Sequence, residues 1–317
     1  MRAGYLFLVK GRVLGLALLV WSGAATGNEA ATGRAVDVIR PPGPMAAVPG
    51  GTFIMGIDEE ELANAIDACK EEFGPESGAL ACEQMARFQD AATGQAREVY
   101  VSPFLIDRTE VTGGEYRRCV MAGACDPTPL VAGDTRFIRD DLPVVNVTWY
   151  DAVTYCGWLG KRLPTEAEWE KAARGDDGRR WPWGNIDGDD RANRGRLLSE
   201  ELRPPGGPAG LLATQSDESD GAAAPAPPGS FRWGRSPYGV YDMAGNVAEW
   251  VSDWWSQFGY TGLSLIDPRG VPTGPFRVVR GGSFNDPRFF ARVYYRNSQR
   301  PQQRAISIGF RCARDIR

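Results

Sequence analysis

The spacing of apolar residues predicts short strands mixed with a few amphipathic helices. Apolar and polar positions alternate over 48–56, and apolar residues dominate 99–106, so both segments are predicted strands. Between them, four apolar residues recur at helical spacing and predict a helix with one buried face: Leu62, Ile66, Cys69 and Phe73. The first part of the chain therefore has the mixed pattern of an α+β fold.

Three further helices are predicted from N-capping patterns. In each, a threonine is followed three residues later by an acidic residue: Thr112 with Glu115, Thr148 with Asp151, and Thr165 with Glu168. Each residue of such a pair can accept a hydrogen bond from the main chain of the other, which sets where the helix begins. Gly160 and Gly175 follow at positions suited to end the last two helices. A short strand over 143–147 is predicted just before Thr148.

Regular structure becomes sparse after Trp183. Residues 203–230 contain six Pro and five Gly, and a loop of this length inside a domain is usually functional or disordered. Short strand-like segments return at 238–243, 247–254, 276–280 and 308–312. The pattern indicates few regular elements joined by long loops.

The amino-acid composition excludes several classes of function. The chain has 317 residues, which fits two domains or one larger domain with long loops. It contains no histidine, so histidine-dependent catalytic triads, histidine-bound zinc and histidine-bound iron are excluded. The 36 basic residues are outnumbered by 40 acidic ones and form no basic run, so no nucleic-acid partner is expected.

The N-terminus is predicted to be a signal peptide covering residues 1–27. A positively charged start is followed by the apolar run 13–21 and then by small residues. That run is shorter than the roughly 20 residues that span a bilayer, so no membrane span is expected after cleavage, with an uncleaved anchor as the alternative. Residues 28–45 are expected to form a flexible lead-in. The mature chain is predicted to be periplasmic or secreted.

Six cysteines in an exported chain favour disulfides over free thiols. Three bonds are predicted: Cys69–Cys82, Cys119–Cys125 and Cys156–Cys312. The first two are local, and the third uses the remaining cysteines and would tie the middle of the chain to its end. A thiol-bound metal is the alternative, but no Cys-x-x-Cys spacing supports it. Other pairings stay open, because six cysteines can be connected in many ways.

Several longer motifs occur in order along the chain. They are GGTFIMG at 50–56, DRTEVT at 107–112, GKRLPTEAEWE at 160–170, WPWGN at 181–185, YDMAGNVAEW at 241–250, RGGSF at 280–284 and GFRC at 309–312. Together they resemble the formylglycine-generating enzyme, or sulfatase-modifying factor, family. The resemblance implies a single α+β domain over 46–317 with a C-type-lectin-like fold, little regular secondary structure and long loops. It also implies a disulfide between Cys156 and Cys312.

The chain departs from the family where its catalytic chemistry resides. The resemblance places two copper-binding cysteines shortly after RGGSF, where this chain has Asp286 at the first position and Arg288 or Ala291 at the second. A copper site of that kind needs thiolates, and an iron-dependent branch of the family needs histidine. No catalytic residue is therefore assigned, neither copper nor iron is expected, and formylglycine generation is not expected. A third branch acts in periplasmic siderophore maturation without the cysteine pair, so the scaffold hosts other chemistry.

The resemblance also implies two structural calcium ions. The first would be bound by the side chains of Asp242 and Glu249 and the carbonyls of Gly245 and Val247. The second would be bound by Glu110, Asn193, the Arg194 carbonyl, Asp220 and the Ala222 carbonyl. Calcium takes six to eight oxygen ligands and often mixes carboxylates with carbonyls, which suits both sets. The alternative for the first set is that its two acidic residues cap turns or pair with arginine.

The segment 285–304 is rich in aromatic, Arg, Asn and Gln residues, and the resemblance places it along a ligand cleft. The expected cleft residues are Asp286, Arg288, Tyr294, Tyr295 and Arg296. Tyr and Arg commonly anchor ligands at recognition surfaces, although part of these aromatic residues is expected in the core instead.

Two hypotheses for function follow. The leading one is an exported binding or scaffold module, a pseudoenzyme that presents the 285–304 cleft to a peptide, glycan or protein. The alternative is a periplasmic oxidoreductase or tailoring enzyme of the same family, with Asp286 near a tyrosine as general acid or base. A redox-active bound metal would favour the enzyme, and tight binding without turnover would favour the module.

Overall fold

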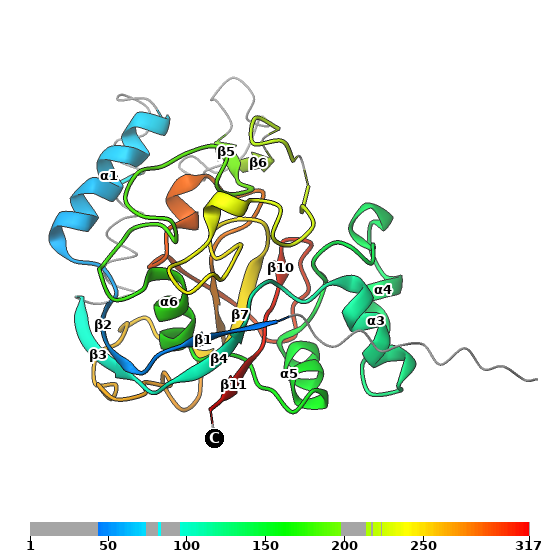
Figure 1. The fold of residues 1–317 in the computed structure, drawn as a ribbon. Coiled ribbons are helices and arrows are strands. Elements are labelled where there is room, and N and C mark those ends of the chain that lie inside the picture. The colour runs from blue at the N-terminus through cyan, green and yellow to red at the C-terminus, as the bar shows by residue number, and fades with distance from the viewer. Residues whose placement is uncertain are drawn as a thin grey trace, which may run out of the picture. The chain divides into compact units, whose positions relative to one another are not determined.

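The computed structural model describes residues 44–73, 82–83, 96–197, 214–216, 218–222 and 224–316. The predicted signal peptide and most of the predicted lead-in lie outside the described residues. The elements used below are, in chain order, β1 (Met45–Val48), β2 (Gly51–Met55), α1 (Glu59–Phe73), β3 (Arg97–Val101), β4 (Phe104–Asp107), α3 (Gly113–Met121), α4 (Thr128–Val131), η1 (Thr135–Phe137), α5 (Trp149–Trp158), α6 (Glu166–Arg174), β5 (Gly195–Leu197), β6 (Thr214–Ser216), η3 (Arg232–Gly234), β7 (Ala248–Trp254), β8 (Arg277–Arg280), η4 (Arg288–Ala291), β9 (Arg296–Gln299), β10 (Ile308–Gly309) and β11 (Ala313–Asp315) (Figure 1).

Four short sheets organise these elements. The four-stranded sheet has the order β10-β7-β8-β9, with β10 parallel to β7 and the other pairs antiparallel. The three-stranded sheet β1-β4-β11 joins the first described strand to the last one. Two pairs, β2-β3 and β5-β6, complete the set. Helix α6 packs against β2 and β3 and also against β7 and β8, so it is the central helix (Figure 1).

The three predicted capping boxes are confirmed. Thr112, Thr148 and Thr165 each accept a hydrogen bond from the main-chain N–H three residues later, and the acidic side chain there accepts one in return. Gly160 follows α5 with φ 66°, and Gly175 ends α6 with φ 77°. Glycine adopts these left-handed values at little cost, so both helices end where the sequence predicts.

Some predicted strands are interrupted or irregular. Residues 48–56 contain a turn between β1 and β2, and Pro103, which has no N–H to donate, lies between β3 and β4. Segments 143–147 and 238–243 form no strand, because Asn146 and Asp242 each adopt φ 58°, which breaks an extended chain. Strand β9, in contrast, lies in a segment for which no strand is predicted.

The three predicted disulfides are confirmed. Their Cα–Cα distances are 5.7 Å for Cys69–Cys82, 5.3 Å for Cys119–Cys125 and 5.7 Å for Cys156–Cys312, within the usual range. All six cysteines of the chain are used, and none has a free thiol. Within the described ranges, no helix has both the length and the apolar character needed to cross a membrane.

Helix α6 is buried along its whole length, charged residues included. Buried charges need partners, and several of these bind the main chain of β2 and its flank. Lys171 donates to the Gly51 carbonyl at 2.7 Å, and Arg174 donates to the Ile54 and Gly56 carbonyls at 3.0 and 2.7 Å. The polar side chains of α6 therefore bind the surrounding main chain in addition to the packing of its apolar side chains.

Candidate binding cleft

A cleft of about 210 Å³ opens where β7, β8 and β9 meet the loop that follows β8. Its lining residues are Ala248, Val279, Gly282, Asp286, Phe290, Tyr295 and Asn297. Two of the five residues predicted to line a cleft, Asp286 and Tyr295, are among them. The structure thus brings the predicted segment to a cleft, but with a different set of side chains.

Tyr294 and Arg296 point into the interior rather than into this cleft. They are 1% and 3% exposed, whereas their neighbours Tyr295 and Asn297 line the cleft. Side chains of an extended segment alternate between its two faces. Arg296 and Asn297, both in β9, follow this alternation, whereas Tyr294 is directed into the core from the turn before the strand.

The two candidate positions for the missing second cysteine also lie outside the cleft lining. Arg288 donates to the Ala68 carbonyl at 3.2 Å and lines a separate charged depression with Asp187 and Asp220. Ala291 is completely buried at the end of η4. Only the first position, Asp286, therefore presents a side chain to the cleft.

Asp286 is a half-buried carboxyl in the wall of the cleft. Its Oδ2 accepts hydrogen bonds from the main-chain N–H and the hydroxyl of Ser283, at 2.9 and 2.8 Å. In the described part of the chain no group donates to Oδ1. Burial raises the pKa of Asp286, and the two Ser283 hydrogen bonds only partly oppose this. The carboxyl can thus accept a hydrogen bond from a ligand or, once protonated, donate one.

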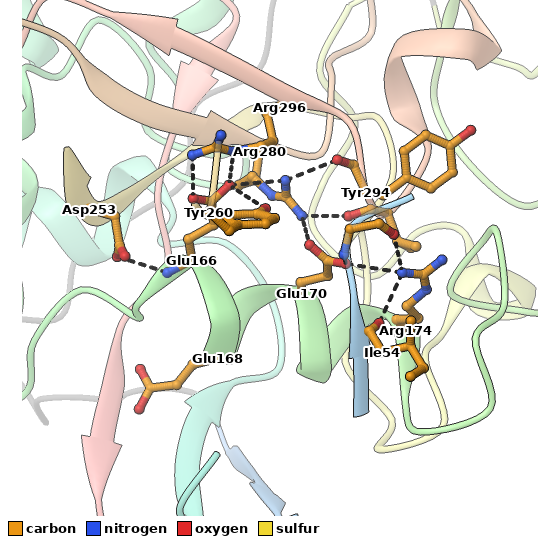
Figure 2. A network of polar contacts seen from close by, with 12 residues as sticks. Ile54, Glu166, Glu168, Glu170, Arg174, Asp253, Tyr260, Arg280, Tyr294 and Arg296 are labelled. Atoms are coloured by element: carbon orange, nitrogen blue, oxygen red, sulfur yellow. Dashed lines mark hydrogen bonds and ion pairs between the residues drawn. The ribbon is translucent and has the colours of Figure 1, made fainter. Parts of the chain in front are cut away.

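A network of buried charges beneath the cleft fixes β8 and β9 against α6 (Figure 2). Arg296 binds both oxygens of Glu166, at 2.6 and 2.8 Å. Arg280 donates to Glu166 at 3.1 Å and to Glu170 at 2.6 Å. Burial alone would raise the pKa of Glu166, but the charges of Arg296 and Arg280 outweigh it and hold that pKa below its ordinary value. Glu166 is therefore a carboxylate in the core.

Arg280 also holds the main chain that leads into the cleft. Arg280 donates to the carbonyls of Val293 and Tyr294, at 2.7 and 3.2 Å (Figure 2). These carbonyls directly precede Tyr295. The network under the sheet therefore holds the main chain directly before a cleft side chain.

Asp253 lies at the edge of this network (Figure 2). It accepts hydrogen bonds from the main-chain N–H of Glu166 at 2.8 Å and from the hydroxyl of Ser252 at 2.9 Å. Burial, and next the charge of Glu166, raise the pKa of Asp253 to about 7. The folded chain therefore holds a proton here that an unfolded chain loses near pH 4.

We expect Asp253 to make stability depend on pH. Between the ordinary pKa of 3.8 and the folded value of about 7, only the folded state binds this proton, so the free energy of unfolding falls as pH rises through that window. Asp253→Asn keeps an acceptor for Glu166 and removes the titration. The free energy of unfolding is measured in urea at pH 5, 6 and 7. Its slope against pH should be less negative in the variant by up to about 1.4 kcal/mol per pH unit. Equal slopes in the two proteins would contradict the assignment.

The first predicted calcium set is largely occupied by protein donors. Glu249 is fully buried and binds Arg311 through both oxygens, at 2.6 and 2.7 Å, and Trp169 at 2.9 Å. Asp242 accepts a hydrogen bond from the Gly229 N–H at 2.6 Å. Among the residues that the structure describes, no three Asp, Glu, Cys or His side chains converge as a metal site. The pairing with arginine, left open in the sequence, is what the structure has at Glu249.

The second predicted set is divided into two parts. Glu110 and Asn193 both bind Asn246, at 2.9 and 3.2 Å, and each retains one buried oxygen that has no hydrogen-bond partner among the residues that the structure describes. Asp220 instead accepts hydrogen bonds from the main-chain N–H groups of Arg194 and Ala222, at 2.7 and 2.9 Å. A buried oxygen without a donor is costly, so the Glu110 and Asn193 oxygens are suited to a hard cation.

Three cleft residues lie outside the predicted segment 285–304: Ala248, Val279 and Gly282. Phe290 and Asn297 lie inside it but are not among the five predicted cleft residues. For Gly282 a signal exists, since it belongs to the RGGSF motif and adopts φ 66°. A Cβ there would lie 2.7 Å from the Phe290 carbonyl oxygen, so a larger residue does not fit without a shift. Ala248 and Val279 come from different strands, and no local pattern indicates that these strands pair beside the cleft.

Comparison with known proteins establishes the family. The family described as "Sulfatase-modifying factor enzyme 1-like domain" matches residues 36–316. The chain belongs to this family. The formylglycine-generating enzyme of Thermomonospora curvata is 34% identical to it over 319 residues, which cover 86% of this chain and 93% of that protein. The mouse protein named inactive C-alpha-formylglycine-generating enzyme 2 is 30% identical over 360 residues, which cover 99% of this chain and 97% of that protein.

A solved structure supports the same family assignment. PvdO from Pseudomonas aeruginosa is similar with a TM-score of 0.64 and 27% identity, over 86% of this chain and 94% of PvdO. The predicted family and the predicted α+β fold class are therefore confirmed for this sulfatase-modifying-factor-like domain.

Proposed function

We propose that this member of the family is a binding module whose cleft holds a ligand without cysteine-dependent oxidation. The observation that carries the proposal is that all six cysteines are in disulfides, which leaves no thiol for a copper ion. A thiolate copper site cannot be rebuilt from Asp286 and Ser283, which bind each other in the cleft wall. The mouse protein that is similar along nearly the whole chain is named as inactive, so this family includes such members.

The chemistry of the cleft favours a small polar group with an apolar face. Asp286 and the Asn297 amide supply polar contacts, and Phe290 and Tyr295 form an edge-to-face pair with ring centroids 4.9 Å apart. A cleft of about 210 Å³ admits one side chain or one sugar ring of a larger ligand. The ligand class is therefore a peptide, glycan or protein segment with a donor for Asp286. Three disulfides and the predicted signal peptide support a place outside the cytosol, in the periplasm or secreted.

The test combines an assay for turnover with an assay for binding. The purified chain is incubated with a cysteine-containing sulfatase peptide, Cu²⁺ and oxygen, and the peptide mass is followed, with the Thermomonospora curvata enzyme as positive control. We expect no conversion. On peptide and glycan arrays we expect the wild-type chain to bind and Asp286→Ala to lose about ten-fold in affinity, while Asp140→Ala, at an exposed carboxylate, binds normally. Conversion of the peptide would instead establish an enzyme.

A structural calcium ion at the second predicted set belongs to the same proposal. The unpartnered buried oxygens of Glu110 and Asn193 are the observation that supports it, and Asp220 with the carbonyls of Arg194 and Ala222 would complete the set. The ion would supply no chemistry beyond holding loops that lack hydrogen-bond ladders of their own.

Calcium removal tests this site directly. We expect EDTA to lower Tm by about 5 °C relative to protein with calcium about 100-fold above Kd, because a ligand that binds only the folded state stabilises it by about 2.7 kcal/mol at that concentration. Glu110→Gln should abolish the response to calcium, and Asp140→Asn should keep it. A wild-type Tm that does not depend on calcium would contradict the proposed calcium site.

A further inference from the structure

A second concave site, unrelated to the cleft, lies between the segment around Trp183 and the segment around η3. This basin has a volume of about 570 Å³ and shares no lining residue with the cleft at Asp286. Three aromatic and three basic side chains dominate its lining: Trp183, Trp233, Tyr238, Arg179, Arg191 and Arg235. This combination differs from the rest of an acidic chain, in which 40 Asp and Glu outnumber 36 Lys and Arg.

One aromatic wall of the basin is held in place before any ligand binds. Trp183 stacks on Trp181 with centroids 5.4 Å apart and planes 5° apart, and its indole N–H donates to the Ile186 carbonyl at 2.9 Å. Trp233 is 60% exposed, so a large flat apolar surface faces solvent. Burial of the exposed Trp233 indole by a ligand is strongly favourable. The Trp183 indole, which is already fixed, loses little entropy on binding.

The turn that carries Trp233 is fixed against the opposite wall. A Cβ at Gly234 would lie only 1.9 Å from the Arg191 carbonyl oxygen, so the η3 turn contacts the main chain of residue 191 directly. This contact sets the spacing between Trp233 and Arg235 on one side and Arg191 on the other. Replacement of Gly234 by any larger residue would force the basin apart.

Two of the three arginines are available for an anion. Arg179 is bound by both oxygens of Asp177, at 2.8 and 2.5 Å, so its charge is neutralised. Within the described ranges, Arg191 has only a distant ion pair, with Asp190 at 3.9 Å. Arg235 is exposed and has no side-chain hydrogen bond or ion pair with any residue that the structure describes. Guanidinium groups bind carboxylate or sulfate oxygens two at a time, so this wall is suited to a planar or tetrahedral anion.

We propose that this basin binds an anionic saccharide, with a sugar ring stacked on Trp233 and its carboxylate or sulfate bound by Arg235 and Arg191. A pyranose ring presents a face of C–H groups that packs on an indole, and its hydroxyls suit a wide polar basin better than an enclosed apolar pocket. Neutral glycans lack the anionic group that Arg235 and Arg191 would bind. Small inorganic anions lack the ring that would stack on Trp233.

The experiment titrates the full chain with tetragalacturonate, with a heparin tetrasaccharide and with neutral galactotetraose, by calorimetry and by tryptophan fluorescence. We expect at least one anionic oligosaccharide to bind about ten-fold or more tightly than the neutral one. Trp233→Ala and Arg235→Gln should each weaken that binding about ten-fold, and Trp233→Ala should also remove the fluorescence change. Arg232→Gln is the matched control, since it removes the same charge from an exposed arginine three residues away that does not line the basin.

Three results would overturn the proposal: no binding of either anionic oligosaccharide, equal binding of the neutral one, or equal losses in Arg232→Gln and Arg235→Gln. Carboxylated and sulfated sugars are distinguished by which of the two probes binds. Because Asp286 lies in the other site, Asp286→Ala should leave this binding unchanged. Failure of the cleft hypothesis and failure of the basin hypothesis are therefore separate outcomes.

Discussion

Replacing both Cys156 and Cys312 by alanine is expected to lower the free energy of unfolding by about 5 kcal/mol. The bond closes a segment of 156 residues, and a crosslink restricts the unfolded chain more as the closed loop grows. Both cysteines are completely buried beside Tyr155 and Phe310, so the loss of the two sulfur atoms also leaves a small cavity that adds to the cost. Urea unfolding followed by tryptophan fluorescence measures the change.

The local disulfide provides the matched comparison. Cys119 and Cys125 are 6 positions apart, and the same reasoning gives about 2.2 kcal/mol for their replacement by alanine. The long-range bond should therefore contribute about twice as much as the local one. Equal losses in the two double variants would show that the restriction of the unfolded chain is not the main effect.

Local signals in this sequence predict local structure well. Thr148 and Thr165 begin their helices as the capping pattern indicates, and Gly175 ends α6. A capping box involves residues three positions apart, so nothing distant has to be known to recognise it. The same holds for the close pair Cys119 and Cys125.

The interior of the domain depends on partners that lie far apart in the sequence. Glu249 binds Arg311 across 62 positions, and Arg280 binds Glu166 across 114. No periodicity indicates which acidic residue meets which arginine. The predicted calcium ligand Glu249 therefore has a guanidinium partner that no local pattern indicates.

The cleft was predictable at the level of the segment but not of the side chain. Composition and family resemblance both indicate 285–304, and Asp286 and Tyr295 do line a cleft. Tyr294 and Tyr295 lie in the turn before β9, so strand alternation does not decide which of them faces outward. Tyr294 belongs to the buried core and Tyr295 lines the cleft, and only the structure decides between them.

Glu166→Gln is expected to destabilise the fold by about 3 to 5 kcal/mol, because removal of one partner leaves buried charge uncompensated. Glu166 binds both Arg280 and Arg296, and all three side chains are at most 2% exposed. Glutamine has the same shape and retains one acceptor. The loss of stability therefore measures the effect of the missing charge rather than the effect of a cavity. Urea unfolding at pH 7 measures the effect.

Asp140→Asn is the control for this variant. Asp140 is 67% exposed at its side chain and pairs with Arg117 at 2.9 Å, and a surface pair of this kind contributes at most about 1 kcal/mol. A second measurement links the network to the cleft. Because Arg280 holds the carbonyls of Val293 and Tyr294, amide hydrogen exchange over 293–299 should accelerate in Glu166→Gln and stay unchanged in the control. A destabilised variant whose exchange accelerates evenly over the whole domain would show that the network supports the fold without positioning Tyr295.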